Sequence, residues 1–255
     1  MRSVGLGPGI VLVPGAGRAA HHYARLSAKL AGLFTVHAID RRGRGESGPQ
    51  GDSYCIEREV EDVAAVLEAT RSHFVFGHSY GGLIGLEAAR VLPIERLAAW
   101  EPAVSLSGSF PAAAMPPFVE AVAHGRDAVA QAMVVKTVIG RPFDALPLAA
   151  IQALVALYTW GNHRRDRPTL VTAMSAELAQ IVRLDSDGSR YADISVRTLL
   201  LAGANSRAFL TSPPRELARV IPHAEARVVA GLAHMAPDEQ APARVAELLR
   251  AFFSA

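Results

Sequence analysis

One five-residue segment constrains the fold of this chain more than any other: Gly77-His78-Ser79-Tyr80-Gly81. It matches the pattern Gly-x-Ser-x-Gly, follows the apolar run 73–76 and precedes a helix-like segment, 82–90. A strand, a sharp turn and a helix in this order form a nucleophile elbow, in which a serine lies on a strained turn with its hydroxyl exposed. Glycines at both ends of the turn let the strand and the helix approach closely. We therefore predict that Ser79 is a nucleophile.

Strand-like and helix-like segments alternate around this motif, which indicates an α/β fold with a mostly parallel central sheet flanked by helices. The alternation stops between Val104 and Leu184, where the periodicity predicts helices only. One of these helices, 148–158, is apolar on more than one face, so we expect it to be buried on two sides. Short apolar runs predict the strands, at 10–13, 34–39, 73–76, 97–100, 196–202 and 226–230.

The helical stretch suggests a division into a core, 1–103 and 185–255, and an all-helical cap, 104–184, inserted after the strand that ends near Glu101. Ligands of open α/β sheets bind beyond the carboxyl ends of the strands, so a cap inserted there would cover the site and exclude water. Within the cap, candidates to line a substrate pocket are Met133, Tyr158 and Trp160, although packing in the core is the simpler interpretation of each.

A serine hydroxyl is a weak nucleophile until a base accepts its proton, and histidine is the usual base because its pKa lies near neutral pH. Of the nine histidines, His234 is the best placed. It follows the last predicted strand and a short loop, 231–233, and it precedes the final helix. This position puts it on the same rim of the sheet as Ser79, so we predict that His234 is the base.

Bulk properties exclude several classes of protein. The formal net charge of +2 includes no basic tract long enough for a nucleic-acid-binding arm. Cys55 is the only cysteine, so no disulfide framework forms within the chain. We see neither a signal peptide nor an apolar segment that would span a bilayer. We therefore expect a cytoplasmic protein that binds a small-molecule substrate, with no nucleic-acid or membrane partner; a homodimer remains open.

Four motifs, spread over most of the chain, together resemble the α/β-hydrolase fold. They are 11–17 (VLVPGAG), 40–47 (DRRGRGES), 77–82 (GHSYGG) and 231–235 (GLAHM), in the order that the family uses. The resemblance implies an oxyanion hole made of two backbone N–H groups, those of Tyr80 and Ala16. The family often has His-Gly where this chain has Pro14-Gly15, but the donor is a backbone group, so the hole can still form.

The family completes a catalytic triad with an acid that orients the histidine. This acid is less obvious in the sequence than the nucleophile and the base. The family most often places it after the strand that we predict at 196–202, where this chain has Asn205. Some members carry it one strand earlier, where this chain has Glu101, and the order Ser79, Glu101, His234 still fits the family. We favour Glu101, because a carboxylate stabilises the imidazolium by charge and an amide does not. The alternatives are Asn205 as a neutral orienting group, or a Ser–His dyad in which Glu101 only braces the entry to the cap.

The sequence thus predicts a serine hydrolase that cleaves an ester, thioester or lactone bond in a small, largely apolar molecule through an acyl-enzyme. No metal and no organic cofactor is expected, because no cluster of metal ligands, Walker loop or dinucleotide fingerprint is present. The same fold and triad also support carbon–carbon bond cleavage, lyase chemistry and acyl transfer or cyclisation. A non-catalytic small-molecule receptor is the remaining alternative.

Overall fold

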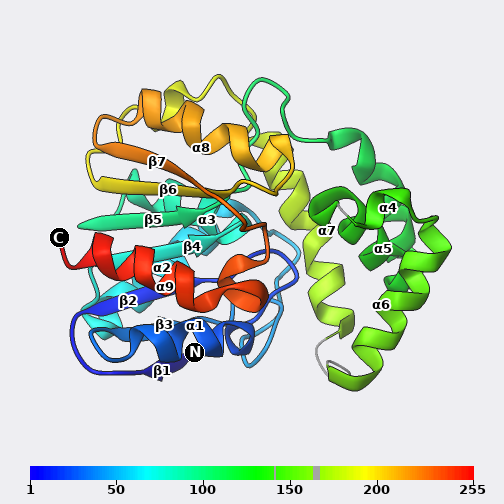
Figure 1. Cartoon of the computed structure of the whole chain (residues 1–255), viewed down its shortest axis with the longest axis horizontal. Coiled ribbons are helices and arrows are strands. Elements are labelled where there is room, and N and C mark those ends of the chain that lie inside the picture. Colours follow the sequence, from blue (N-terminus) through cyan, green and yellow to red (C-terminus); the bar gives the residue numbers. More distant parts are fainter. Residues whose placement is uncertain (141, 163–166) are drawn as a thin grey trace.

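The computed structural model describes residues 1–140, 142–162 and 167–255, and for 158–162 and 167–170 it describes the backbone only. Figure 1 shows a layered core on one side and a group of helices, α4 to α7, on the other. The two chain ends both lie on the core. This arrangement is the α/β architecture that the sequence predicts, with a mostly parallel sheet between helices.

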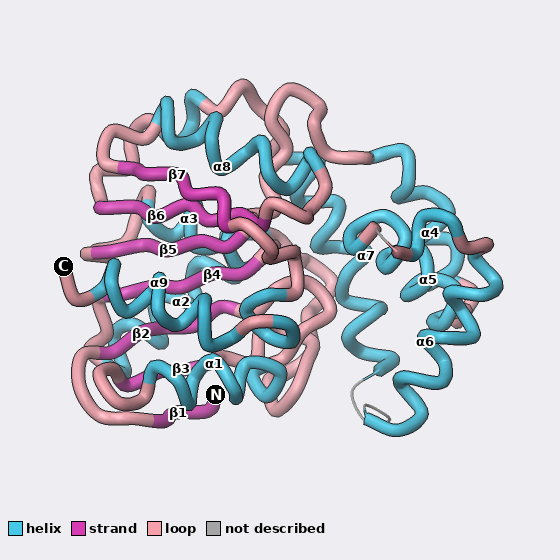
Figure 2. The backbone as a smooth tube through the Cα atoms, viewed as in Figure 1, coloured by secondary structure: helices cyan, strands magenta, loops and turns pink. Residues whose placement is uncertain are grey.

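The central sheet has seven strands in the order β1-β3-β2-β4-β5-β6-β7, all parallel except β1, which pairs antiparallel with β3 (Figure 2). Every predicted strand is present, within two residues of its expected ends. The sequence pattern does not predict β1, because this edge strand has only three residues and all of them are exposed. The strands are Arg2–Val4 (β1), Gly9–Val13 (β2), Thr35–Ala38 (β3), Phe74–His78 (β4), Arg96–Trp100 (β5), Arg197–Gly203 (β6) and Ala224–Val229 (β7).

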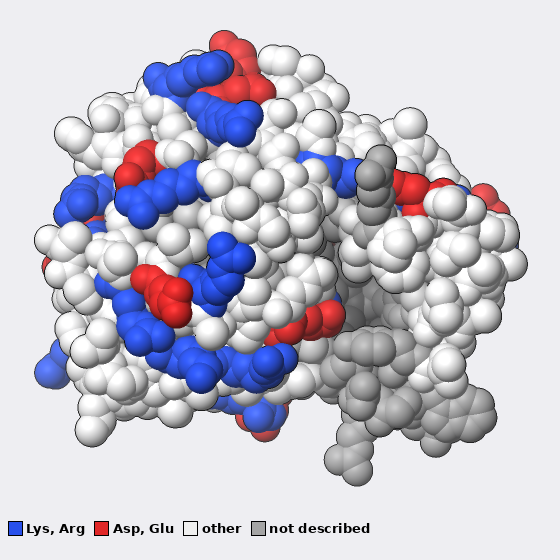
Figure 3. All heavy atoms as spheres, viewed as in Figure 1, with Lys and Arg blue, Asp and Glu red and all other residues white. Residues whose placement is uncertain are grey.

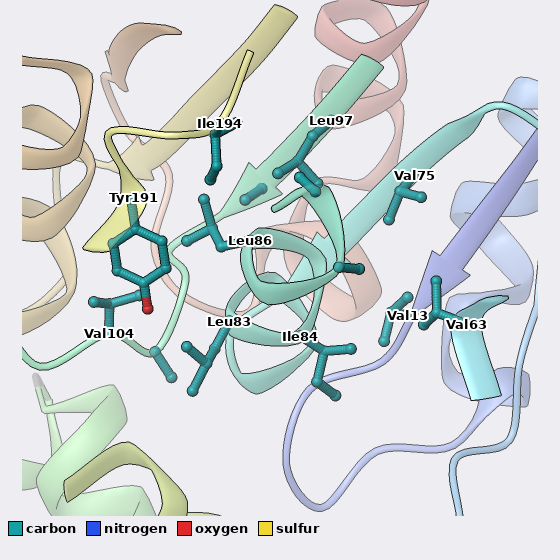
Figure 4. Close-up of a cluster of buried hydrophobic side chains, with 14 of the residues drawn as sticks. Val13, Val63, Val75, Leu83, Ile84, Leu86, Leu97, Val104, Tyr191 and Ile194 are labelled. Atoms are coloured by element: carbon teal, nitrogen blue, oxygen red, sulfur yellow. The ribbon is translucent and has the colours of Figure 1, made fainter. Parts of the chain in front are cut away.

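The inner strands are buried on both faces, which explains their continuous apolar sequences. Alternate residues of β2 enter different layers: Val11 and Val13 belong to the cluster that α2 and α3 cover, whereas Ile10 and Leu12 belong to the cluster that α1 and α9 cover. Figure 4 shows the cluster that contains Val11 and Val13, with Ile84 of α3 on the side of Val13 and Leu83 on the side of Val104. The core helices are Ala24–Leu30 (α1), Ile56–Thr70 (α2), Tyr80–Ala89 (α3), Ala208–Val220 (α8) and Pro242–Phe253 (α9).

Between β5 and β6 the described residues form helices and loops, with an isolated bridge between Leu106 and Ser186. We call these helices the cap. Its helices are Met115–Ala123 (α4), Asp127–Val134 (α5), which continues into a π-helical turn at Val135–Ile139, Leu148–Asn162 (α6) and Arg167–Arg183 (α7). Figure 3 shows acidic and basic side chains interspersed over the core, whereas the described cap surface in that view is largely uncharged.

The expectation that the 148–158 helix is buried on two sides is wrong for the residues that the structure describes. Helix α6 packs against α5, and Ile151 is fully buried. Leu157 lies on its open side and is 72 % exposed, and Leu154 is 48 % exposed. The helix therefore has an apolar composition without a second layer to cover it.

Candidate active site

Ser79 lies between β4 and α3, on a turn that only a strained backbone can make. Its φ of 54° and ψ of −118° are unusual for a residue with a side chain. Two glycines make the turn possible, because a Cβ on Gly77 would collide with the carbonyl oxygen of Gly81, and one on Gly81 with that of Val13. The Ser79 N–H donates to the Trp100 carbonyl at 2.8 Å, which anchors the turn to β5. The local geometry is that of a nucleophile elbow.

The structure brings His234 and Glu101 together from loops 133 residues apart. His234 Nδ1 lies 2.7 Å from Glu101 Oε2, and Glu101 is fully buried at the end of β5. The other carboxylate oxygen, Oε1, accepts the Gly203 N–H at 2.7 Å. A carboxylate only accepts hydrogen bonds, so Nδ1 carries the ring proton and Nε2 is left as the basic nitrogen. This is the arrangement that a general base needs.

Asn205, the alternative orienting residue, is placed differently. It is exposed, and its backbone N–H donates to the Leu232 carbonyl at 2.9 Å. Among the hydrogen bonds of the described residues, His234 Nδ1 donates to Glu101 Oε2. The group that orients the imidazole through Nδ1 is therefore the carboxylate.

A chain of hydrogen bonds links His234 to the loop after β2 through His78, whose role the sequence does not predict. The His78 Nε2–H donates to the His234 carbonyl at 3.0 Å, and Nδ1 accepts the Tyr23 hydroxyl at 2.7 Å. The Tyr23 oxygen in turn accepts the Gly15 N–H at 3.1 Å. Burial lowers the pKa of His78 well below its usual value, which keeps the ring neutral, as these partners require.

Tyr80 and Ala16, whose backbone amides are expected to form the oxyanion hole, border the same cavity as Ser79. Tyr80 is the first residue of α3, so its N–H has no acceptor inside the helix. Ala16 lies in the loop after β2, and within the described part of the chain no hydrogen bond uses its N–H. The loop lies close to the nucleophile, since a Cβ added to Gly15 would be 3.1 Å from the Cβ of Ser79.

The cavity has a volume of about 560 Å³ and lies between the core and the cap. Ser79 and His234 border it on the core side, and Met133 lines it on the cap side. The other two predicted lining residues, Tyr158 and Trp160, lie outside the side chains that the structure describes. Most of the wall is apolar, including Phe118, Val134, Val138, Leu154, Val171, Met174 and Leu178.

Charged groups on the cavity wall are partnered. Arg18 lies 2.9 Å from Asp238 and 2.7 Å from Glu239, measured between the nitrogen and oxygen atoms of each ion pair. Burial raises the pKa of Asp238 from 3.8 to about 6. Within the described residues no group of three or more histidine, cysteine, aspartate and glutamate side chains is arranged to hold a metal ion. None of the described helices combines the length and hydropathy that crossing a membrane requires.

Comparison with known proteins finds the same fold. An alpha/beta hydrolase from Sphaerobacter thermophilus DSM 20745 is 32 % identical, has a TM-score of 0.81 and is matched over 99 % of this chain and 95 % of its own. The enol-lactonase of Burkholderia xenovorans LB400 shares the fold at 23 % identity, with a TM-score of 0.73 over 100 % of this chain and 95 % of its own.

Matches to curated proteins are shorter. The putative carbamate hydrolase RutD of Variovorax paradoxus (strain S110) is 40 % identical over 93 residues, which are 33 % of this chain and 35 % of RutD. The curated relatives are matched over about a third of their length or less. The model of the Alpha/beta hydrolase family, in contrast, matches residues 10–248. The chain therefore belongs to the alpha/beta hydrolase family.

Proposed function

We propose that this protein is a serine hydrolase that cleaves an ester, thioester or lactone bond in a small, largely apolar molecule. The observation that carries the proposal is the 2.7 Å hydrogen bond between Glu101 and His234, beside a cavity that Ser79 also borders. A buried carboxylate fixes the imidazole in the tautomer that accepts a proton at Nε2. A histidine held in this way activates a serine hydroxyl.

The reaction proceeds in two halves. Ser79 Oγ attacks the substrate carbonyl while His234 Nε2 takes the hydroxyl proton, and the N–H groups of Tyr80 and Ala16 stabilise the oxyanion. His234 then gives the proton to the leaving oxygen or sulfur, and an acyl-enzyme remains on Ser79. Water, deprotonated by the same Nε2, attacks the acyl carbon, and the carboxylic acid leaves as Ser79 recovers its proton.

The substrate class follows from the cavity. Its wall is mostly aliphatic and aromatic, and its charged residues Arg18 and Glu239 are paired with each other, while Arg18 also pairs with Asp238. A volume of about 560 Å³ lies in the range of pockets that enclose drug-sized ligands. An uncharged, apolar acyl group or lactone fits this environment, because a charged substrate would lose its hydration without gaining an unpaired partner.

The test begins with a fluorophosphonate probe, which Ser79 attacks at phosphorus with loss of fluoride. We expect rapid labelling of the wild type and none of Ser79→Ala. A panel of p-nitrophenyl esters, acyl thioesters and lactones then defines the bond that is cleaved; the enol-lactonase and RutD support including lactones and carbamates. A folded wild type that resists the probe would contradict the proposal and favour a receptor.

A further inference from the structure

Four charged side chains form a buried cluster behind the proposed oxyanion hole. Arg41 and Arg44 follow β3, Glu59 belongs to α2 and Glu177 belongs to α7 of the cap. None of them is more than 2 % exposed. Arg41 Nη2 lies 2.9 Å from Glu59 Oε1 and 2.6 Å from Glu177 Oε1, and Arg44 pairs with the same oxygen of Glu177. The cap therefore contributes one of the two carboxylates that neutralise the cluster.

Both arginines also hold the loop that carries Ala16. Arg41 Nη1 donates to the carbonyls of Pro14 and Gly15 at 3.2 and 3.3 Å. Arg44 Nη1 donates to the carbonyls of Gly15 and Arg18 at 3.4 and 3.3 Å. These carbonyls flank Ala16 on both sides, so the position of the guanidinium groups determines where the Ala16 N–H lies.

The same cluster contacts the residue that supplies the second amide. The Arg41 guanidinium lies over the ring of Tyr80, 4.7 Å from its centroid, and the Tyr54 hydroxyl bridges Tyr80 and Glu59 with hydrogen bonds of 3.0 Å. Although burial alone would lower the pKa of Arg41, the carboxylates of Glu177 and Glu59 raise it well above its usual value. Arg41 is therefore a permanent cation whose position depends on both carboxylates.

Helix α7 touches the loop at further points. Met174 lies against Gly17, since a Cβ on that glycine would be 3.0 Å from the sulfur, and Leu178 packs in one cluster with Ala16. Glu177 is the polar member of this contact and the one that reaches both arginines. Seating of the cap and the shape of the loop are thus connected through named side chains.

We propose that Glu177 is a positioning residue that couples the cap to the oxyanion hole, by holding Arg41 and Arg44 against the loop that carries Ala16. This inference rests on the proposed function. Because the oxyanion develops only in the transition state, a displaced Ala16 N–H lowers kcat and leaves ground-state binding nearly unchanged. Glu177 touches neither substrate nor reacting atoms in this scheme and acts through the two arginines.

The test compares Glu177→Gln with Glu57→Gln. The control removes the exposed ion pair between Glu57 of α2 and Arg183 of α7, 2.8 Å apart, which also joins cap and core but does not contact the loop. For Glu177→Gln we expect kcat on the wild type's best p-nitrophenyl ester, and the fluorophosphonate labelling rate, to fall about 10- to 100-fold. The KM of Glu177→Gln should stay within about threefold of wild type. Glu57→Gln should match wild type in kcat, in KM and in labelling rate.

A second measurement distinguishes a role of Glu177 in positioning the loop from a role in stabilising the fold. A boronic acid binds serine as a tetrahedral adduct, so its affinity should fall by the same factor as kcat/KM, whereas inhibition by the product acid should not change. Glu177→Gln that unfolds at lower temperature but keeps wild-type kcat per folded molecule would overturn the inference. So would a loss confined to KM.

Two conservative variants serve if Glu177→Gln does not fold. Glu177→Asp keeps the negative charge on a shorter side chain. Arg44→Lys keeps the positive charge but loses the planar guanidinium group that donates to two carbonyls of the loop. Both should lower kcat with KM retained; wild-type kcat in both would overturn the inference. Ser79→Ala distinguishes this failure from that of the proposed function: if it labels as fast as wild type, the hydrolase mechanism itself is wrong.

Discussion

Replacing Glu101 by Gln tests the orientation of His234 with almost no change of shape. Both carboxylate oxygens face hydrogen-bond donors, the Gly203 N–H at 2.7 Å and His234 Nδ1 at 2.7 Å. A glutamine has only one oxygen, and its NH2 group must face one of these two positions. The backbone N–H of Gly203 cannot change into an acceptor, whereas the imidazole can change tautomer. The amide oxygen therefore turns to Gly203, and the NH2 group turns to His234.

The consequence is a histidine with the wrong nitrogen protonated. Nδ1 becomes the acceptor, Nε2 carries the proton, and the base can no longer accept the proton of Ser79. A triad in which an amide replaces the carboxylate typically loses about 10⁴-fold in kcat through this tautomer change. At roughly 1.4 kcal/mol per tenfold, the barrier should rise by about 4 to 5.5 kcal/mol, which corresponds to a 10³- to 10⁴-fold loss.

The assay is steady-state hydrolysis of the best p-nitrophenyl ester by wild type, Glu101→Gln and Ser79→Ala, with thermal unfolding recorded for each. Ser79→Ala gives the background rate against which a 10³-fold loss must be resolved. KM should change little, because Glu101 is fully buried and does not border the cavity. If folded Glu101→Gln keeps kcat within tenfold of wild type, the tautomer argument is refuted and a Ser–His dyad is the better description.

Three further substitutions test other parts of the structure. Tyr23→Phe leaves the buried Gly15 N–H and His78 Nδ1 without their partner, so urea unfolding should show a loss of about 2 to 3 kcal/mol, accompanied by a lower kcat. Burial raises the pKa of Asp238 from 3.8 to about 6, so the folded state holds this proton more tightly than the unfolded chain. Its contribution, roughly 3 kcal/mol, is present below about pH 4 and lost as the pH rises through about 6; unfolding from pH 4 to 7 should show this loss in wild type and not in Asp238→Asn. Gly81→Ala places a Cβ against a carbonyl oxygen of β2, so we expect insoluble or unfolded protein on expression; a soluble variant with wild-type Tm would contradict the packing of the elbow.

The inner strands could be predicted because parallel strands are buried on both faces and leave uninterrupted apolar runs. The β1 strand could not, since its three residues are exposed and pair only at the edge of the sheet. Helix α6 shows the opposite failure. Its composition predicts burial on two sides, but composition does not say how many partners a helix has, and here α5 covers one side while Leu157 stays exposed.

The candidate site divides in the same way. Ser79 and His234 could be singled out because a turn, a glycine pattern and a strand end mark each of them locally. The supporting residues could not, because their partners are distant in sequence: His78 binds the His234 carbonyl, 156 residues away, and Glu177 reaches Arg41 across 136 residues. A histidine in the variable position of Gly-x-Ser-x-Gly carries no sequence signal for such a contact.

Ser79 and Glu101 share a feature that explains how the sheet assembles this site. Both follow neighbouring parallel strands, and both have positive φ values, 54° and 44°, which cost energy for residues with a side chain. Each is held by the next strand, because the Ser79 N–H bonds to Trp100 at the end of β5, and the Glu101 N–H bonds to Leu201 in β6, both at 2.8 Å. The hydrogen bonds between neighbouring strands thus continue one residue beyond β4 and β5. They fix the strained backbones of Ser79 and Glu101, which orient the two side chains. A substitution that loosens the end of β5 should therefore disturb nucleophile and acid together, although they belong to different loops.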